Sequence, residues 1–142
     1  MVLTIYTDGG SKGNPGPASI GIVMYEDGKE VLRYREDIGV ATNNDAEYRA
    51  LLKALELITD KSSTLHVLPA SPAGGSYKKL EFYSDSSLMV NQLNGLFKVK
   101  NGKIREYISQ IRNLEGAVKL PIFYKHIPRE ENTVADDLVN NK

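Results

Sequence analysis

Four acidic residues fall at places in the chain where their carboxylates could act together. Asp8 ends a short β-branched and aromatic run at residues 2–7, and Asp85 ends a second run at 79–84. Glu47 and Asp136 each lie early in a predicted helix. Carboxylates gathered in one place repel one another unless a cation lies between them. With no cysteine and two histidines in the chain, an oxygen-rich cluster favours Mg²⁺ or Mn²⁺ over zinc.

Each acidic residue also has a simpler structural interpretation. Asn44 precedes Glu47 by three residues, which is the spacing of a helix capping box. Asp85 could cap the helix that follows it, Asp8 could be a turn residue, and Asp136 could be a solvated helix charge. Taken together the four favour a shared site, because four independent coincidences would otherwise have to meet in one crevice.

The elements that must position these groups follow from the periodicity of the sequence. Three strands are predicted first, at 2–7, 18–26 and 30–39, and the "DG" at 27–28 is a strong hairpin signal. A helix follows at 46–58, with an apolar stripe formed by Tyr48, Leu51, Leu52, Leu55 and Ile58. The remaining elements are a strand at 79–84, helices at 87–95 and 104–116 ended by Gly95 and Gly116, a strand at 120–127 and a helix at 132–141. The first three strands should be antiparallel, and those that alternate with helices should be parallel. In such a sheet the carboxyl ends of neighbouring parallel strands form the usual ligand crevice.

Composition bounds the possible classes of protein. The 142 residues fit one domain, 1–142, with a predicted loop insertion at 59–78, which is rich in Ser, Pro, Gly and Ala. No apolar run approaches the length of a membrane span, and we expect a monomeric cytoplasmic protein with no membrane partner. The formal net charge is zero, so any binding of nucleic acid must use a local basic patch.

The stretch "DGGSKGNPGPASIG", residues 8–21, holds five glycines and two prolines between two predicted strands. This composition is typical of a wide hairpin turn. It is also what the edge of a site for a polyanion requires, because glycines let a ligand approach main-chain amides.

Four segments in order make the sequence similar to type 1 ribonucleases H: "YTDGGSKGNPGPASIG", "TNNDAEYRALLKAL", "FYSDSSLMVNQLNG" and "IPREENTVADDLV". The resemblance runs over nearly the whole chain. It implies an α/β fold of the ribonuclease H type, with a five-stranded mixed sheet in the order 3-2-1-4-5 flanked by helices.

The resemblance also implies a reaction, the endonucleolytic hydrolysis of the RNA strand of an RNA–DNA hybrid with two divalent ions. Asp8 would bridge both ions, Asp136 would complete the nucleophile-side ion, and Glu47 with Asp85 the leaving-group ion. The products would carry 5′-phosphate and 3′-hydroxyl ends. Asp137 competes with its neighbour for the last role, but one helical step turns a side chain by about 100°. The family pattern around Asn132, Ala135 and Leu138 selects Asp136.

Substrate contacts follow from the same resemblance. The RNA strand would meet Asn14, the backbone of Gly9 and Gly10, and the pair Asn43 and Asn44. Thr42 and Asn43 are placed for a DNA phosphate. Helix capping is the alternative for the asparagine pair.

Two departures from the family pattern bear on the substrate. The chain has no tryptophan and lacks the basic helical handle of many relatives, so Lys98, Lys100, Lys103 and Arg105 form a possible substitute patch or a merely solvated stretch. The short loop "PREEN" has no histidine like the mobile one of many relatives, so Arg129 or Glu130 would have to serve instead, or no residue does. His126, in the alternation of the last strand, is interpreted as structural.

Three other interpretations are weighed against this one. Another metal nuclease of the same superfamily is disfavoured by the terminal Asn132-to-Leu138 pattern and by the Gly-Asn-Pro-Gly loop. A non-catalytic module that only binds hybrids is disfavoured because all four carboxylates are present. A domain cut from a polyprotein or reverse transcriptase is less simple than a stand-alone enzyme.

Overall fold

The computed structural model describes residues 1–60 and 76–141. Within them the five strands are β1 (Val2–Ser11), β2 (Gly16–Glu26), β3 (Lys29–Ala41), β4 (Lys79–Ser84) and β5 (Ile122–His126). The helices are α1 (Asn43–Thr59), α2 (Ser87–Leu93), α3 (Gly102–Val118) and α4 (Thr133–Val139), with a short 3-10 turn at Arg129–Glu131. Most of the predicted insertion at 59–78 lies outside the described residues.

The strands form one mixed sheet in the order β3-β2-β1-β4-β5, which confirms the predicted topology. The pairs β1–β2 and β2–β3 are antiparallel, whereas β4 runs parallel to both β1 and β5. The β2–β3 hairpin turns through Asp27 and Gly28, whose φ angles of 48° and 83° are those required by a tight primed turn. The "DG" signal was therefore correct.

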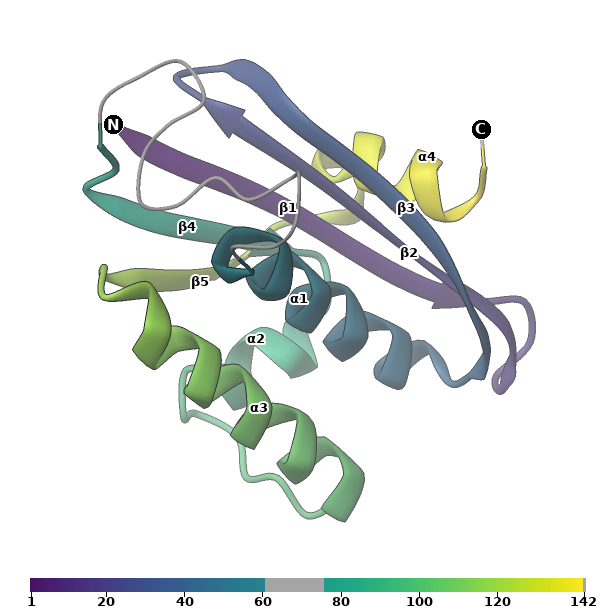
Figure 1. Ribbon diagram of the computed structural model, residues 1–142. Helices are drawn as coiled ribbons and strands as arrows, with labels where there is room; N and C mark the ends of the chain where they lie inside the picture. Colours follow the sequence, from purple (N-terminus) through teal and green to yellow (C-terminus); the bar gives the residue numbers. More distant parts are fainter. Residues whose placement is uncertain (61–75, 142) are drawn as a thin grey trace.

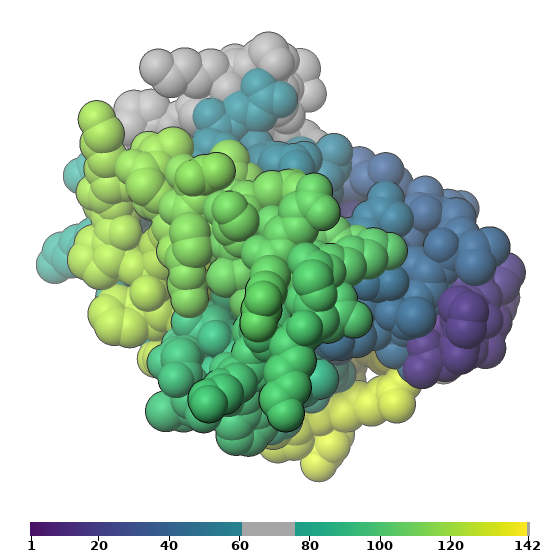
Figure 2. Space-filling model, turned by 90° about the horizontal axis from the view of Figure 1, so that it is seen from below, coloured from purple at the N-terminus to yellow at the C-terminus, as the bar shows by residue number. Residues whose placement is uncertain are grey.

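The helices divide between the two faces of the sheet (Figure 1). The first three pack on one face, and α4 lies on the opposite face over β1 and β2. The predicted stripe of α1 is buried in the core, with Tyr48, Leu55 and Ile58 fully inaccessible. Figure 2 shows α3 in the middle of the helical face, with the β1–β2 hairpin at its right edge. In the described part of the chain, no helix is long and apolar enough to cross a membrane.

Several boundaries differ from the predicted ones. The first strand continues past residue 7 to Ser11, because the glycines after Asp8 pair with β2 instead of turning. The long helix begins at Asn43, since the Thr42 hydroxyl accepts a hydrogen bond from the Asp45 amide at 3.1 Å. The predicted stop at Gly116 was wrong: α3 runs on to Val118 and ends where Lys119 adopts a left-handed φ of 58°.

Candidate active site

Asp8 and Asp85 reach the same level of the sheet from two parallel strands. The last parallel pair of β1 and β4 joins Tyr6 to Tyr83, and each aspartate follows two residues later along the chain. Two residues keep a side chain on the same face, so both aspartates lie above that pair. Asp8 itself is inside β1, opposite Gly21 of β2, and not at the end of its strand as expected. β4 ends at Ser84, so Asp85 follows it directly.

Glu47 reaches this level from α1 because Gly9 lets the helix approach the strand. A Cβ at Gly9 would lie 2.3 Å from the backbone of Ala46, so no side chain fits at this position. The Gly9 amide donates a hydrogen bond to the Glu47 carboxylate at 3.0 Å. The capping-box interpretation of Asn44 and Glu47 is wrong, because Thr42 is the capping residue and Glu47 bonds to β1 instead.

Asp85 is likewise not a helix cap. The Ser86 hydroxyl accepts the bond from the Met89 amide at 3.2 Å, so the capping position of α2 is already filled. One ligand atom from each of Asp8, Glu47 and Asp85 falls within 4.8 Å of the others. Three hard oxygen ligands at that separation suit a divalent ion such as Mg²⁺ or Mn²⁺.

Asp136 lies beside this cluster, on α4. The helix comes close to β2 because Gly21 lacks a side chain; a Cβ there would be 2.5 Å from the Ala135 carbonyl oxygen. At its start, the buried Asn132 amide donates to the Thr7 carbonyl at 2.9 Å. Asp136 is half-buried and lines the crevice, whereas Asp137 is exposed and does not.

The electrostatics of the cluster call for a cation. The pKa of Asp8 is raised to about 8, first by burial and then by repulsion from Asp85 and Asp136. Burial, followed by the charges of Asp8 and Asp85, also raises the pKa of Glu47 well above its usual value. The Arg129 guanidinium contacts the Asp136 carboxylate at 3.4 Å and is the one basic group that bonds to these four acids in the described residues. A divalent cation would offset the repulsion far more fully, which makes the donor set a fit for metal.

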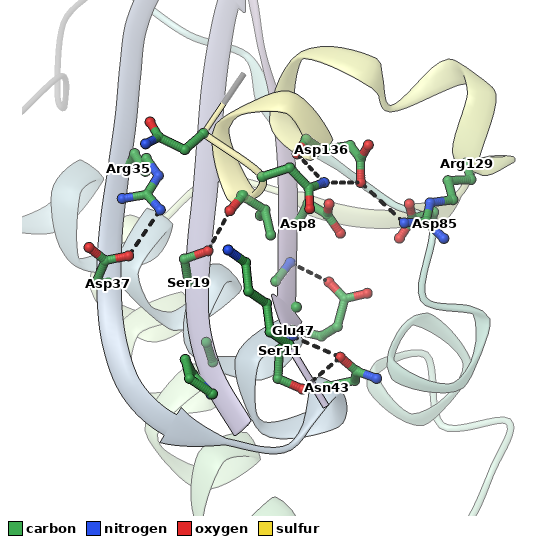
Figure 3. Close-up of a pocket in the computed structure, with 18 residues that line it drawn as sticks. Asp8, Ser11, Ser19, Arg35, Asp37, Asn43, Glu47, Asp85, Arg129 and Asp136 are labelled. Carbon is green, nitrogen blue, oxygen red and sulfur yellow. Dashed lines mark hydrogen bonds and ion pairs between the residues drawn. The ribbon is translucent and has the colours of Figure 1, made fainter. Parts of the chain in front are cut away.

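The four acids open into one crevice of about 580 Å³ (Figure 3). It runs from Glu47 and Asp85 past Asp136 and across the same face of the sheet toward β3, where Lys12, Ser19 and Arg35 line it. Lys12 and Ser19 lie in the glycine-rich motif but were not singled out as site residues, and Arg35 lies outside every motif of the sequence. Their participation comes from the β2 and β3 register and from the hairpin that folds over the crevice.

The predicted RNA-side residues form a network at the hairpin. The Asn43 side chain accepts hydrogen bonds from the Ser11 amide and hydroxyl at 2.9 and 3.0 Å. The Asn14 side chain accepts from the Asn43 amide at 3.0 Å. Both asparagines are exposed, so their NH₂ groups face solvent beside the crevice, and Asn44 is half-buried. The network joins the hairpin to the start of α1.

The glycines of the hairpin differ in what they offer. The Gly9 amide is bonded to Glu47 and is not free for a ligand. Gly10 lines the crevice, and a Cβ there would meet only a Val139 methyl at 3.4 Å. Thr42 keeps a hydroxyl proton to donate, because its oxygen acts as acceptor in the helix cap.

The basic stretch after α2 is exposed and close to the start of α1. Lys98 and Lys100 form no ion pair within the described residues, whereas Lys103 reaches Asp45 at 3.3 Å. Arg105 donates to the Val99 carbonyl at 2.9 Å. Sequence reasoning missed two apolar neighbours, Leu96 and Phe97, which are 71% and 49% exposed.

Two further positions named from the sequence lie at the edges of the site. Glu130 is exposed, and unlike Arg129 it does not line the crevice. His126 is exposed at the end of β5, opposite Ser84, and is not part of the core.

Comparison with known proteins adds an independent line of evidence. The family model described as RNase H matches residues 1–142. The chain is 36% identical over 143 residues to the bifunctional protein Rv2228c of Mycobacterium tuberculosis, covering 99% of this chain and 35% of that protein. It is also 36% identical over 137 residues to the ribonuclease HI of Halobacterium salinarum, covering 95% of this chain and 61% of the relative. The chain thus spans about a third and about three fifths of these relatives.

Solved structures share the fold at similar identity. The crystal structure of LC11-RNase H1 in complex with an RNA/DNA hybrid superposes with a TM-score of 0.80 and 37% identity, over 98% of this chain and 94% of that one. That protein was isolated from compost by a metagenomic approach.

Proposed function

Because this chain belongs to the ribonuclease H family, type 1, we propose that it hydrolyses the RNA strand of RNA–DNA hybrids. The observation that carries the proposal is the convergence of Asp8, Glu47 and Asp85 within 4.8 Å, with Asp136 lining the same crevice. The solved relative that holds an RNA/DNA hybrid supports the same substrate for this chain.

We assign the four carboxylates to two divalent ions. Asp8 would touch both, Asp136 would serve the ion on the nucleophile side, and Glu47 and Asp85 the ion on the leaving-group side. When bound, a pair of such ions stabilises the attacking and the leaving oxygen of an in-line displacement, here leaving 5′-phosphate and 3′-hydroxyl ends. Mg²⁺ is the proposed ion, and Mn²⁺ offers the same hard-ligand chemistry.

Neighbouring groups of the protein orient two of the carboxylates. The Gly9 amide keeps one Glu47 oxygen turned toward β1, which fixes its orientation. Arg129 orients Asp136 from the rim of the crevice and adds positive charge where a phosphate must enter. We assign it the auxiliary role left open by the missing loop histidine, and we assign none to the exposed Glu130.

Recognition of the two strands is assigned to separate surfaces. Asn14, Asn43, Asn44 and the backbone of Gly10 would contact the 2′-hydroxyl groups and phosphates of the RNA strand beside the crevice. Thr42, Lys98 and Lys100 would contact DNA phosphates, since they lie along the side that leads from the start of α1 to the start of α3. Exposed Leu96 and Phe97 suit the apolar face of deoxyribose on that side.

Cleavage of a labelled RNA–DNA hybrid tests the proposal, with RNA–RNA and DNA–DNA duplexes as controls. We expect cutting of the hybrid alone, in Mg²⁺ or Mn²⁺ and not in EDTA. The product ends should be rejoined by a ligase without prior phosphorylation, because they would carry a 5′-phosphate and a 3′-hydroxyl. A protein that binds the hybrid but never cuts it in either metal would be the non-catalytic module instead. No metal-dependent cutting and no binding would remove the hybrid as substrate.

The basic surface is tested separately by salt dependence. Lys98→Gln and Lys100→Gln together should weaken hybrid binding and lower the slope of log K against log salt by about 1–2, because each phosphate contact contributes about 0.9. The matched control is Lys29→Gln, an exposed lysine at the far hairpin. Equal slopes for the double variant and the control would show that the stretch is merely solvated.

A further inference from the structure

Asp136 stands on a helix that cannot hold its own position. α4 has seven residues, from Thr133 to Val139, and isolated helices of that length are unstable in water. Of its last four carbonyl groups, those of Asp136 and Leu138 accept the backbone amides of Asn140 and Asn141 just past the helix, at 3.0 and 3.2 Å. Contacts from the sheet must therefore fix where α4, and with it the Asp136 carboxylate, comes to rest.

Two side chains from other strands bind the end of this helix. Arg35 on β3 donates its Nε hydrogen to the Leu138 carbonyl at 2.7 Å. Ser19 on β2 donates its hydroxyl to the Val139 carbonyl, also at 2.7 Å (Figure 3). The Arg35 guanidinium is in turn held by Asp37 at 2.9 Å. These bonds give the Val139 carbonyl a donor and the Leu138 carbonyl a second donor besides the Asn141 amide. They also add a positive charge at the helix end where a cation is favoured.

The link from these bonds to Asp136 is short and rigid. The Asp136 carbonyl accepts the Asn140 backbone and side-chain amides at 3.0 and 2.9 Å, which close the last turn directly beside Leu138 and Val139. Gly21 lets the backbone of Ala135, the residue before Asp136, lie directly against β2. Because Asp136 is only two residues from Leu138, a shift of the helix end would move Asp136 as well.

We propose that Arg35 and Ser19 are positioning residues that clamp α4 to the sheet and thereby keep Asp136 in register with Asp8. The part of this inference that concerns metal rests on the proposed function. An ion shared by Asp8 and Asp136 binds only when α4 is docked, so its apparent affinity falls in proportion to the docked fraction. Linkage works in both directions, and a bound ion must favour the docked helix to the same extent.

Arg35→Met, which keeps the side-chain stem and removes the donor, is the informative variant, and Ser19→Ala removes the second bond alone. The matched control is Arg33→Met on the same strand, which breaks an exposed ion pair to Glu30 without touching α4. Asp37→Asn removes the partner of Arg35 but leaves its bond to Leu138. Arg35→Lys, which restores a cation and a donor, serves as the rescue.

The first measurement is hydrogen exchange of the α4 amides in metal-free protein. Because a hydrogen bond from a charged donor is lost, Arg35→Met should speed exchange at Asp136 and Asn140 about tenfold or more, and Ser19→Ala about fivefold. Arg33→Met should leave it unchanged, and Arg35→Lys should recover part of the protection. Exchange in β1 and α1 should stay at the native rate in every variant, which separates release of α4 from general loss of stability.

The second measurement is calorimetric titration with Mn²⁺, together with hybrid cleavage. Arg35→Met should weaken the ion that depends on Asp136 and lower kcat with little change in KM, and Mn²⁺ should restore its α4 protection. If α4 exchange in Arg35→Met and Ser19→Ala matches that of Arg33→Met, the clamp is refuted. If α4 exchange is faster in Arg35→Met and Ser19→Ala but the wild-type protein never cleaves hybrid, the clamp stands and the proposed function alone is overturned.

Discussion

Replacing Asp8 by asparagine should make the metal-free protein more stable while it removes the activity. Asp8 is 6% exposed and has acidic neighbours in Glu47, Asp85 and Asp136, so its charge is costly in the absence of a cation. Asparagine has the same shape, can donate to a neighbouring carboxylate and carries no charge. The substitution should therefore raise the stability of the metal-free fold and abolish the reaction.

The magnitude follows from the shifted pKa. Asp8 has an ordinary pKa of 3.8 that is raised to about 8 in the folded chain. At pH 7 the unfolded state has lost the Asp8 proton, whereas the native state still holds it or has ionised at a cost. The difference between pH 7 and the ordinary pKa is about three units, at about 1.36 kcal/mol each, so the destabilisation of the native state is at most about 4 kcal/mol. Neighbouring acids share this cost, so we expect a gain of about 1–3 kcal/mol. For a chain of this length that raises Tm by about 3–10 °C.

The sign of the pH dependence provides an internal check. A carboxyl group with a raised native pKa destabilises the fold only where it is ionised, so the wild type should lose stability as pH rises from about 4 to about 8. The advantage of Asp8→Asn should be absent near pH 4 and grow over that window. Saturating Mg²⁺ should close the gap, because it stabilises the wild type and not the variant.

Calorimetric unfolding in EDTA at pH 4, 6 and 8 measures this directly. The control is Asp137→Asn, an exposed aspartate next to the site, which should stay within about 0.5 kcal/mol of the wild type at every pH. Hybrid binding by Asp8→Asn should survive while turnover is nearly abolished. The reasoning is refuted if Asp8→Asn is destabilised at pH 8 in EDTA, or if it still turns over at the wild-type rate.

The remaining predictions concern α4 and the sheet. Asp136→Asn should lower kcat about a hundredfold or more, whereas Asp137→Asn should leave it unchanged; the reverse result in steady-state cleavage would place the other aspartate in the crevice. Gly21→Ala should cost about 2–3 kcal/mol in urea unfolding, because the new Cβ would stand 2.5 Å from the Ala135 carbonyl oxygen. The matched change Gly116→Ala lies in α3, where the new Cβ would have no neighbouring atom within 4 Å, and it should instead stabilise the protein by about 0.5 kcal/mol. Equal effects of the two changes would show that Gly21 is not a packing position.

Local signals in the sequence were sufficient for much of the fold. The strand at 79–84 was predicted with its observed bounds, and the apolar stripe of α1 is buried as its period required. These features depend on side-chain alternation within one segment. The sheet order came from the family resemblance and not from such alternation.

Helix ends and strand extension were less predictable because several residues compete for each role. Thr42, Asn43 and Asn44 are all good capping residues, and only the tertiary path into α1 selects Thr42. Gly116 was predicted as a helix stop, yet α3 continues beyond it to the buried Val118. The bonds from Arg35 and Ser19 to α4 join residues more than a hundred positions apart, and no periodicity reports them.

The five glycines of the stretch at 8–21 are present for different reasons. A Cβ at Gly9, Gly16 or Gly21 would fall between 1.9 and 2.5 Å from a backbone atom, so the fold itself demands these three glycines. Gly13 is required by its φ of 87° in the turn. Gly10 alone has room for a side chain at ordinary contact distance, and it lines the crevice. Packing and turn conformation therefore account for four of the five glycines, which bring α1, α4 and the hairpin close enough to assemble the carboxylates, and the proposed contact with a nucleic-acid backbone concerns Gly10 alone.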